Sequence, residues 1–145
     1  MASGAIASFG TLIKMGDGAS PEVFTTIAEL LDIEGPELSV DMEEVTNHSS
    51  TGGFEEDIPN GILRLGEISF EVNYIPTSTT HNGTAGLIAD WKNKTKRNWK
   101  IVWSDSGGTT WTGAAYVTKV NPTAPVAGVL RGSFSIKPTG VWTIA

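Results

Sequence analysis

The stretch Gly61-Ile-Leu-Arg-Leu-Gly-Glu-Ile-Ser-Phe-Glu-Val-Asn-Tyr74 decides the fold class of the chain. In its second half, apolar residues occupy every second position, which predicts a β-strand with one dry and one solvated face. The apolar residues before Gly66 are out of phase with those after it. A glycine at such a phase change indicates a bulge or a tight bend. The stretch is therefore predicted to be one long strand, bent near Gly66.

The bulk composition favours one β-rich domain over residues 1–145. The chain has 145 residues, 17 of them glycine, and no cysteine. This length suits a single domain, and the glycine content suits a protein with many turns. The lack of cysteine excludes disulfides, thiolate metal sites and a cysteine nucleophile. Residues 1–9 are small and apolar and are expected to form a flexible arm, with no pattern of a signal peptide or membrane helix.

Charge is distributed unevenly along the chain. Residues 1–75 carry a net charge of −12 and residues 76–145 a net charge of +6, for a total of −6. Two interpretations stay open. The halves interleave and neutralise each other in one fold, or the acidic surface of one copy meets the basic surface of the next. Contacts of the second kind close into rings or continue as filaments.

The remaining pattern predicts mainly strands and one helix. The segment 84–93 has apolar residues at helical spacing, with Thr80 or Asn82 as candidate caps. The solvated face of 67–73 is acidic and that of 131–137 is basic, so these strands are expected to be neighbours. The segment 22–34 also has some helical spacing but favours strand. Further strands are predicted at 11–15, 37–45, 98–105, 109–120, 126–137 and 141–144, with a loop at 121–125 and a turn at 138–140.

The segment 46–60 is predicted to be a long loop. It is polar and has no periodicity, and loops of this length in a compact domain are usually functional or disordered. It also contains Phe54, Ile58 and Pro59, which a fully solvated loop has little use for. Either the loop folds back on its own core, or it becomes ordered against a partner.

No set of residues predicts catalysis. His48 and His81 are isolated and are expected on the polar surface, and nucleotide-binding and hydrolase motifs are missing. The acidic runs at 43–44 and 55–57 are interpreted as solvated faces rather than metal or catalytic sites. We therefore expect no enzymatic activity, metal or cofactor. The alternative function is a monomeric glycan-binding β-sandwich module that uses exposed tryptophans, although most of the five tryptophans are expected in the core.

The order of segments resembles a known family. A strand, the corner Gly35-Pro36, an acidic strand and a long polar loop lead to Phe54-Glu-Glu-Asp-Ile-Pro-Asn-Gly61 and then to Gly66–Tyr74. This order is similar to the tail tube (major tail) proteins of long-tailed bacteriophages with non-contractile, lambda-type tails (siphoviruses). The resemblance implies a β-sandwich or barrel with one flanking helix. It also implies shared sheets that join six copies into a ring, and rings that stack into the hollow tube through which DNA is ejected.

The resemblance also implies partners and site residues. The partners would be further copies, the tape measure protein, the tail initiator and terminator proteins, and passing DNA that is not specifically bound. The location would be the virion tail, assembled in the bacterial host cytoplasm without a membrane. The loop 46–60 would contact an adjacent ring through His48, Ser50, Phe54, Glu55, Glu56, Ile58 and Pro59. A DNA conduit should not hold phosphates, so the lumen candidates are the polar and acidic Asp41, Glu43, Glu67, Ser69 and Glu71. Candidate basic contacts between subunits are Lys96, Arg97, Arg131 and Lys137.

Overall fold

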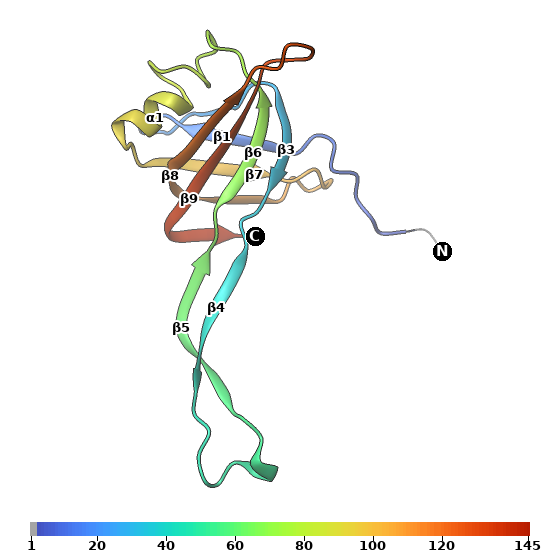
Figure 1. Cartoon of the computed structure of the whole chain (residues 1–145), viewed down its shortest axis with the longest axis vertical. Coiled ribbons are helices and arrows are strands. Elements are labelled where there is room, and N and C mark those ends of the chain that lie inside the picture. Colours follow the sequence, from blue (N-terminus) through green and yellow to red (C-terminus); the bar gives the residue numbers. More distant parts are fainter. Residues whose placement is uncertain (1–2) are drawn as a thin grey trace.

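A computed structural model describes residues 3–145 as a curled sheet body with a long two-stranded hairpin standing off it (Figure 1). The body is a seven-stranded antiparallel sheet in the order β2-β1-β7-β8-β9-β6-β3, and the hairpin is formed by β4 and β5. The elements are β1 (Leu12–Gly16), β2 (Phe24–Thr26), β3 (Leu30–Glu34), β4 (Leu38–Glu44), the 3-10 turn η1 (Thr51–Gly53), β5 (Asp57–Leu65), β6 (Ile68–Asn73), α1 (Leu87–Asn93), β7 (Arg97–Val102), β8 (Thr110–Thr123) and β9 (Arg131–Ile144).

The body sheet curls around one hydrophobic core. Phe70 on β6 and Trp99 on β7 are separated in the sheet by two strands, yet their ring centroids lie 6.4 Å apart. Phe134 stacks on Phe70 at 5.8 Å, and Leu87 of α1 is fully buried in the same core. The predicted mainly β fold with one helix is confirmed.

The two edge strands of the sheet nearly meet. β2 and β3 are joined by residues 27–29 only. The Ile27 N–H donates to the Ile13 carbonyl of β1, and the Asn73 N–H of β6 donates to the Glu29 carbonyl. This connector therefore links the two ends of the curled sheet, although β2 and β3 do not pair with each other.

The stretch 61–74 forms two strands rather than one bent strand. β5 ends at Leu65 and β6 begins at Ile68, so the phase change marks the passage from the hairpin into the body. At the junction, the Gly66 N–H donates to the Glu37 carbonyl at 2.8 Å. A Cβ at Gly66 would lie 3.2 Å from the Glu37 Cβ, so glycine permits this close approach.

The predicted neighbours 67–73 and 131–137 do pair, as strands β6 and β9. Ser69 lies opposite Ser135 and Asn73 opposite Arg131. No ion pair forms between the two strands in the described residues. Instead, Glu67 accepts a hydrogen bond from Thr118, and Lys137 donates to the Leu65 carbonyl at 2.6 Å.

Several predicted boundaries are wrong. The segment 22–34 is two strands, because Glu29 takes a positive φ of 57° and turns the chain between them. β8 continues through 121–123, which had been predicted as loop. Residues 131–144 form one strand, without the predicted turn at 138–140. The pairing of this strand with β8 shifts its register near Gly140, which adopts a positive φ of 72°.

The observed helix α1 begins at Leu87, three residues later than predicted. Asn82 accepts hydrogen bonds from the N–H groups of Thr84, Ala85 and Gly86, so it stabilises the turn that precedes α1. Gly86 is the N-cap residue and has no side-chain cap.

His81 is fully buried, which corrects its expected place on the polar surface. Its Nδ1 accepts the Ile75 N–H at 3.2 Å, so its Nε2–H donates to the Ala28 carbonyl at 2.8 Å. The Ala28 N–H donates to the buried Thr80 hydroxyl. His81 and Thr80 therefore tie the segment before α1 to the connector between the sheet edges. His48 is exposed, as predicted.

Candidate assembly surfaces

The β4–β5 hairpin presents an apolar face that the rest of the chain does not cover. Leu38 lies opposite Leu65, Val40 opposite Leu63, and Met42 opposite Pro59. Residues opposite each other in an antiparallel pair share a face. Leu63 is 79% exposed, Leu38 53% and Met42 51%. We call this surface the apolar face of the hairpin. Isolated two-stranded hairpins are marginally stable in water, so this face is suited to contact a partner.

The opposite face of the hairpin is mixed, with charged and polar residues beside the exposed Ile58 and Ile62. Two of the lumen candidates, Asp41 and Glu43, lie on it. Arg64 binds Asp41 through two of its three side-chain nitrogens, at 2.8 Å from Nε to Oδ1 and 2.6 Å from Nη2 to Oδ2. These hydrogen bonds hold the pKa of Asp41 below its usual range. Glu43 accepts a hydrogen bond from Asn60. Arg64 thus neutralises one of the two expected lining acids, which the sequence analysis did not anticipate.

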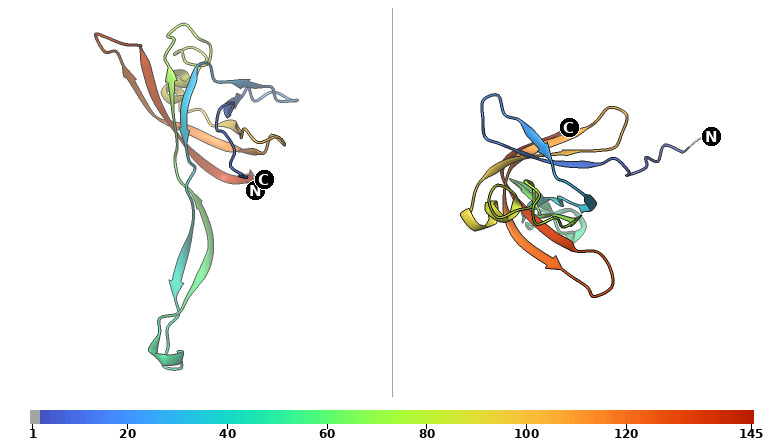
Figure 2. Two further views of the ribbon diagram at one scale, coloured as in Figure 1. Left: turned by 90° about the vertical axis from the view of Figure 1, so that its right-hand side faces the viewer. Right: turned by 90° about the horizontal axis from the view of Figure 1, so that it is seen from above.

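The loop at the end of the hairpin lies far from the body (Figures 1 and 2). The interpretation that it folds back on its own core is therefore wrong. It is ordered by its own contacts, such as Ser50 donating to Glu56 at 2.8 Å and the Glu56 N–H donating to Thr46. Phe54 remains 77% exposed at this tip. Ile58 and Pro59 belong to β5 rather than to the loop, so the tip between the two strands comprises residues 45–56.

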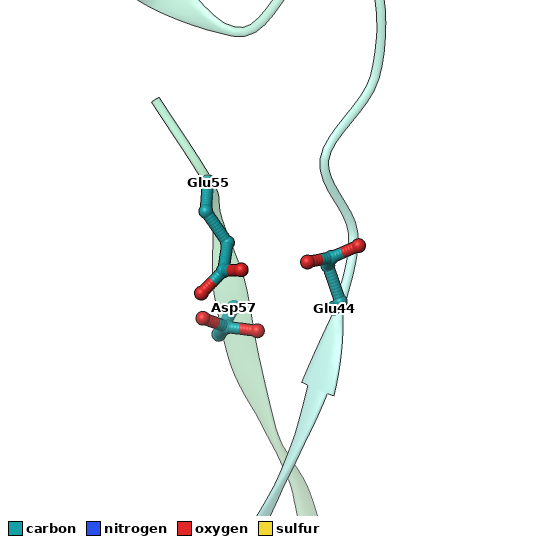
Figure 3. A group of neighbouring side chains, drawn as sticks. All are labelled: Glu44, Glu55 and Asp57. Carbon is teal, nitrogen blue, oxygen red and sulfur yellow. The ribbon is translucent and has the colours of Figure 1, made fainter. Parts of the chain in front are cut away.

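Three carboxylates gather where the hairpin ends. One oxygen each of Glu44, Glu55 and Asp57 lies within 4.8 Å of the others, and all three residues are exposed (Figure 3). Desolvation and then the charge of Glu55 raise the pKa of Asp57. Exposed acids repel one another and are readily hydrated, so this cluster alone does not define a metal or catalytic site.

The remaining lumen candidates lie together on the outer face of the body. Glu67 immediately precedes β6, and Ser69 and Glu71 alternate along β6 with buried apolar residues. Ser69 contacts Ser135 of β9 through their hydroxyls at 3.2 Å. A shallow hollow of about 310 Å³ on this face also includes two acids that the sequence analysis missed, Asp32 and Glu34. Their alternation with Ile33 in β3 was the signal that could have placed them there.

Two of the four candidate basic contacts are used within the chain. Arg97 forms a bidentate ion pair with the buried Asp90, at 2.6 Å, and also donates to the Gly16 carbonyl of β1. Lys137 donates to Leu65, as described above. Arg97 and Lys137 therefore stabilise the body, whereas Lys96 and Arg131 are exposed and available for contact with another copy.

The tryptophans do not form an exposed platform. Trp99 is fully buried and Trp142 is 8% exposed, while Trp103 and Trp111 pack edge to face with ring centroids 5.2 Å apart. Trp91 on α1 is the exception at 51% exposed, although its spacing placed it on the apolar stripe of the helix. Stacking on a sugar chain generally uses several exposed rings, so this arrangement does not favour the glycan-binding alternative.

Comparisons with known proteins identify the fold through structure alone. No protein-family model and no curated protein matches the sequence. A chain in the tail of an empty gene transfer agent particle with C6 symmetry has a TM-score of 0.78 at 18% identity, covering 97% of this chain and 99% of that one. A chain from the native gene transfer agent virion gives 0.76 at 17%, with the same coverage. A chain from the six-fold symmetrised baseplate of the anti-feeding prophage gives 0.68 at 12%, covering 99% and 97%.

Within the described residues, no helix is both long and apolar enough to cross a membrane.

The structural matches span almost the whole chain, and their low sequence identity limits them to a statement about fold. The resemblance seen in the sequence is thus confirmed at that level: the chain has a fold of the phage tail tube type.

Proposed function

We propose that the chain is the repeating structural subunit of a tail tube. Copies close into six-fold rings, and rings stack into a hollow tube through which DNA passes into the host. The similarity to chains from six-fold symmetric tail and baseplate particles supports this role. The open edges of the body sheet also support it, because unpaired strand edges are a liability in a monomer and are removed by assembly.

The exposed apolar face of the hairpin is the observation that carries the proposal. In the single chain, Leu63, Leu38 and Met42 of the hairpin and Phe54 at its tip are largely exposed, so they add little to the free energy of unfolding. Each buried apolar side chain contributes about 1.5–3 kcal/mol when it is removed from water. Because the hairpin projects along the long axis of the molecule (Figure 1), an adjacent ring is the partner that it would reach. The tip residues His48, Ser50, Glu55 and Glu56 and the strand residues Ile58 and Pro59 would take part.

The lumen lining is proposed to be the polar outer face over β3, β6 and β9. This face carries Glu34, Glu71 and several serines, with Glu67 just before β6. The same face of β9 carries Arg131 and Lys137, but Lys137 is bound to the Leu65 carbonyl and the acids outnumber the two bases, so DNA phosphates would not be held. The second candidate lining, Asp41 and Glu43 on the hairpin, is less acidic because Arg64 pairs with Asp41.

The role is structural and non-enzymatic, in a virion tail of the non-contractile, siphovirus type assembled in the bacterial host cytoplasm. The tape measure, tail initiator and tail terminator proteins would be its partners during assembly.

A deletion in the hairpin tip tests the proposal. Removing residues 49–53 and changing Phe54→Ala shortens the tip, whose contacts are all local, so the body should still fold. We expect single rings or monomers by sedimentation and electron microscopy, where the wild type gives tubes. A control with Val141→Ala, an exposed apolar residue of the body, should stack normally. Tubes of normal length from the deletion variant would contradict the assignment of the hairpin.

A further inference from the structure

A groove of about 1070 Å³ lies between the N-terminal arm and the edge of the body sheet. One wall is the arm, in which Phe9 is 96% exposed and Ile6 65% exposed. The other wall is β3, which pairs only with β6 in the described residues and so has a free edge. The groove is largely apolar, through Ile6, Phe9, Leu30, Leu31, Ile33 and Trp103.

Three acids give the groove a negative charge. Glu29 and Asp32 line it and are exposed, and neither has an ion-pair partner in residues 3–145. Asp105 lines the end near Trp103, where the N–H and hydroxyl of Thr109 donate to its carboxylate. These bonds keep the pKa of Asp105 below its usual range, so it is charged at neutral pH. An occupant of this groove should be apolar and should bring positive charge.

The connection between β8 and β9 has these properties. Residues 124–130 read Ala-Pro-Val-Ala-Gly-Val-Leu and contain no charged residue. Val126 is fully exposed and Val129 is 53% exposed. Arg131 follows immediately and is exposed without an ion-pair partner in the described part of the chain. We call residues 124–131 the β8–β9 tip.

We infer that the β8–β9 tip of one copy inserts into the groove between the arm and β3 of a second copy. The inference rests on the proposed function and names the contact by which copies join. In the left view of Figure 2, the β8–β9 tip and the arm lie on different sides of the body, and none of the residues 124–131 lines the groove of its own chain. Each copy offers one tip and one groove, and such a head-to-tail contact repeats from copy to copy.

Charge selects this occupant over the hairpin tip 45–56. That segment carries Glu55 and Glu56 and ends beside Glu44 and Asp57, so it would place like charges against Glu29 and Asp32. The β8–β9 tip instead brings Arg131 to these acids. Val126 and Val129 would then contact the apolar walls, which covers two exposed surfaces at once.

Disulfide trapping tests the contact directly, since the chain has no cysteine. We expect the double variant Leu31→Cys with Val126→Cys to give a ladder of covalent oligomers beyond the dimer on oxidation. A mixture of the two single variants should stop at covalent dimers. The control Leu31→Cys with Val141→Cys has an equally exposed second position outside the tip and should give no ladder.

A charge exchange provides the second measurement. Arg131→Asp should raise the protein concentration required for assembly at least tenfold. Adding Asp32→Arg to this variant should bring that concentration most of the way back to the wild-type value. Lys92→Asp, which reverses an exposed charge on α1, should have no such effect. All three substituted positions are exposed, so the variants should remain folded.

The outcomes separate this inference from the proposed function. Tubes that form without a 31–126 bond, or bonds between two copies of Val126→Cys, would overturn the inference and leave the tube role standing. A 31–126 ladder without rings or tubes would support the contact and contradict the tube. Neither a ladder nor tubes would overturn both.

Discussion

The body and the β4–β5 hairpin differ in how far their apolar side chains are buried. The body encloses Trp99, Phe134 and Leu87 completely, and it also buries a histidine and an ion pair with their partners satisfied. The hairpin leaves most of its apolar side chains in water. The same chain therefore contains a part with an enclosed core and a part whose apolar side chains are exposed and, in the proposed tube, would be covered by another copy.

Matched phenylalanine substitutions should separate the two parts most clearly. Phe134→Ala in the body should cost about 3–5 kcal/mol of unfolding free energy, because it leaves a cavity in a packed core. Phe54→Ala at the hairpin tip should change the same quantity by no more than about 0.5 kcal/mol. Urea unfolding of the monomeric variants measures both. Equal losses would mean that the tip packs on the body.

The two ion pairs allow a second comparison, since both have an Nη2–carboxylate distance of 2.6 Å. Asp90→Ala should cost about 3 kcal/mol, because it leaves Arg97 partly buried without its partner. Asp41→Ala on the exposed hairpin should have a much smaller effect, which added salt weakens further. Urea unfolding at low and high salt measures this. A large loss from Asp41→Ala would contradict the view of the hairpin as solvated in the monomer.

Charge reversal on the outer face of the body tests the lumen assignment. Glu67→Lys with Glu71→Lys should slow DNA ejection from assembled particles several-fold, with the slowing relieved by salt, because the new lysines bind phosphates. The matched pair Asp41→Lys with Glu43→Lys on the hairpin should slow ejection less. If the hairpin pair has the larger effect, the hairpin rather than the body faces the lumen.

The smallest expected effect is a pH dependence at the hairpin tip. The pKa of Asp57 is raised, so its ionised form is disfavoured in the folded hairpin. The tip should be most stable below the usual pKa of an aspartate and lose that increment as pH rises through the raised value. Glu55→Gln should lower the pKa of Asp57 only in part, since desolvation is the larger cause. NMR titration of the Asp57 carboxyl measures this, and a pKa that does not respond to Glu55→Gln would exclude the charge of Glu55.

Local alternation predicted most strands of the body, including the neighbouring strands β6 and β9. It failed where long-range contacts decide. His81 looked like surface because its partners, Ile75 and Ala28, come from a loop and from the connector between the sheet edges. The start of β5 was missed because Pro59 and Gly61 interrupt its pattern. The groove could not be predicted from the sequence, because its walls come from three segments that are far apart in the chain.

Electron microscopy of the purified wild-type protein, with sedimentation of the same sample, tests the central claim most directly. The account predicts hollow tubes of stacked six-fold rings, in which the apolar face of the hairpin is covered by an adjacent ring. A protein that remains monomeric at every concentration, with the hairpin still exposed, would contradict it.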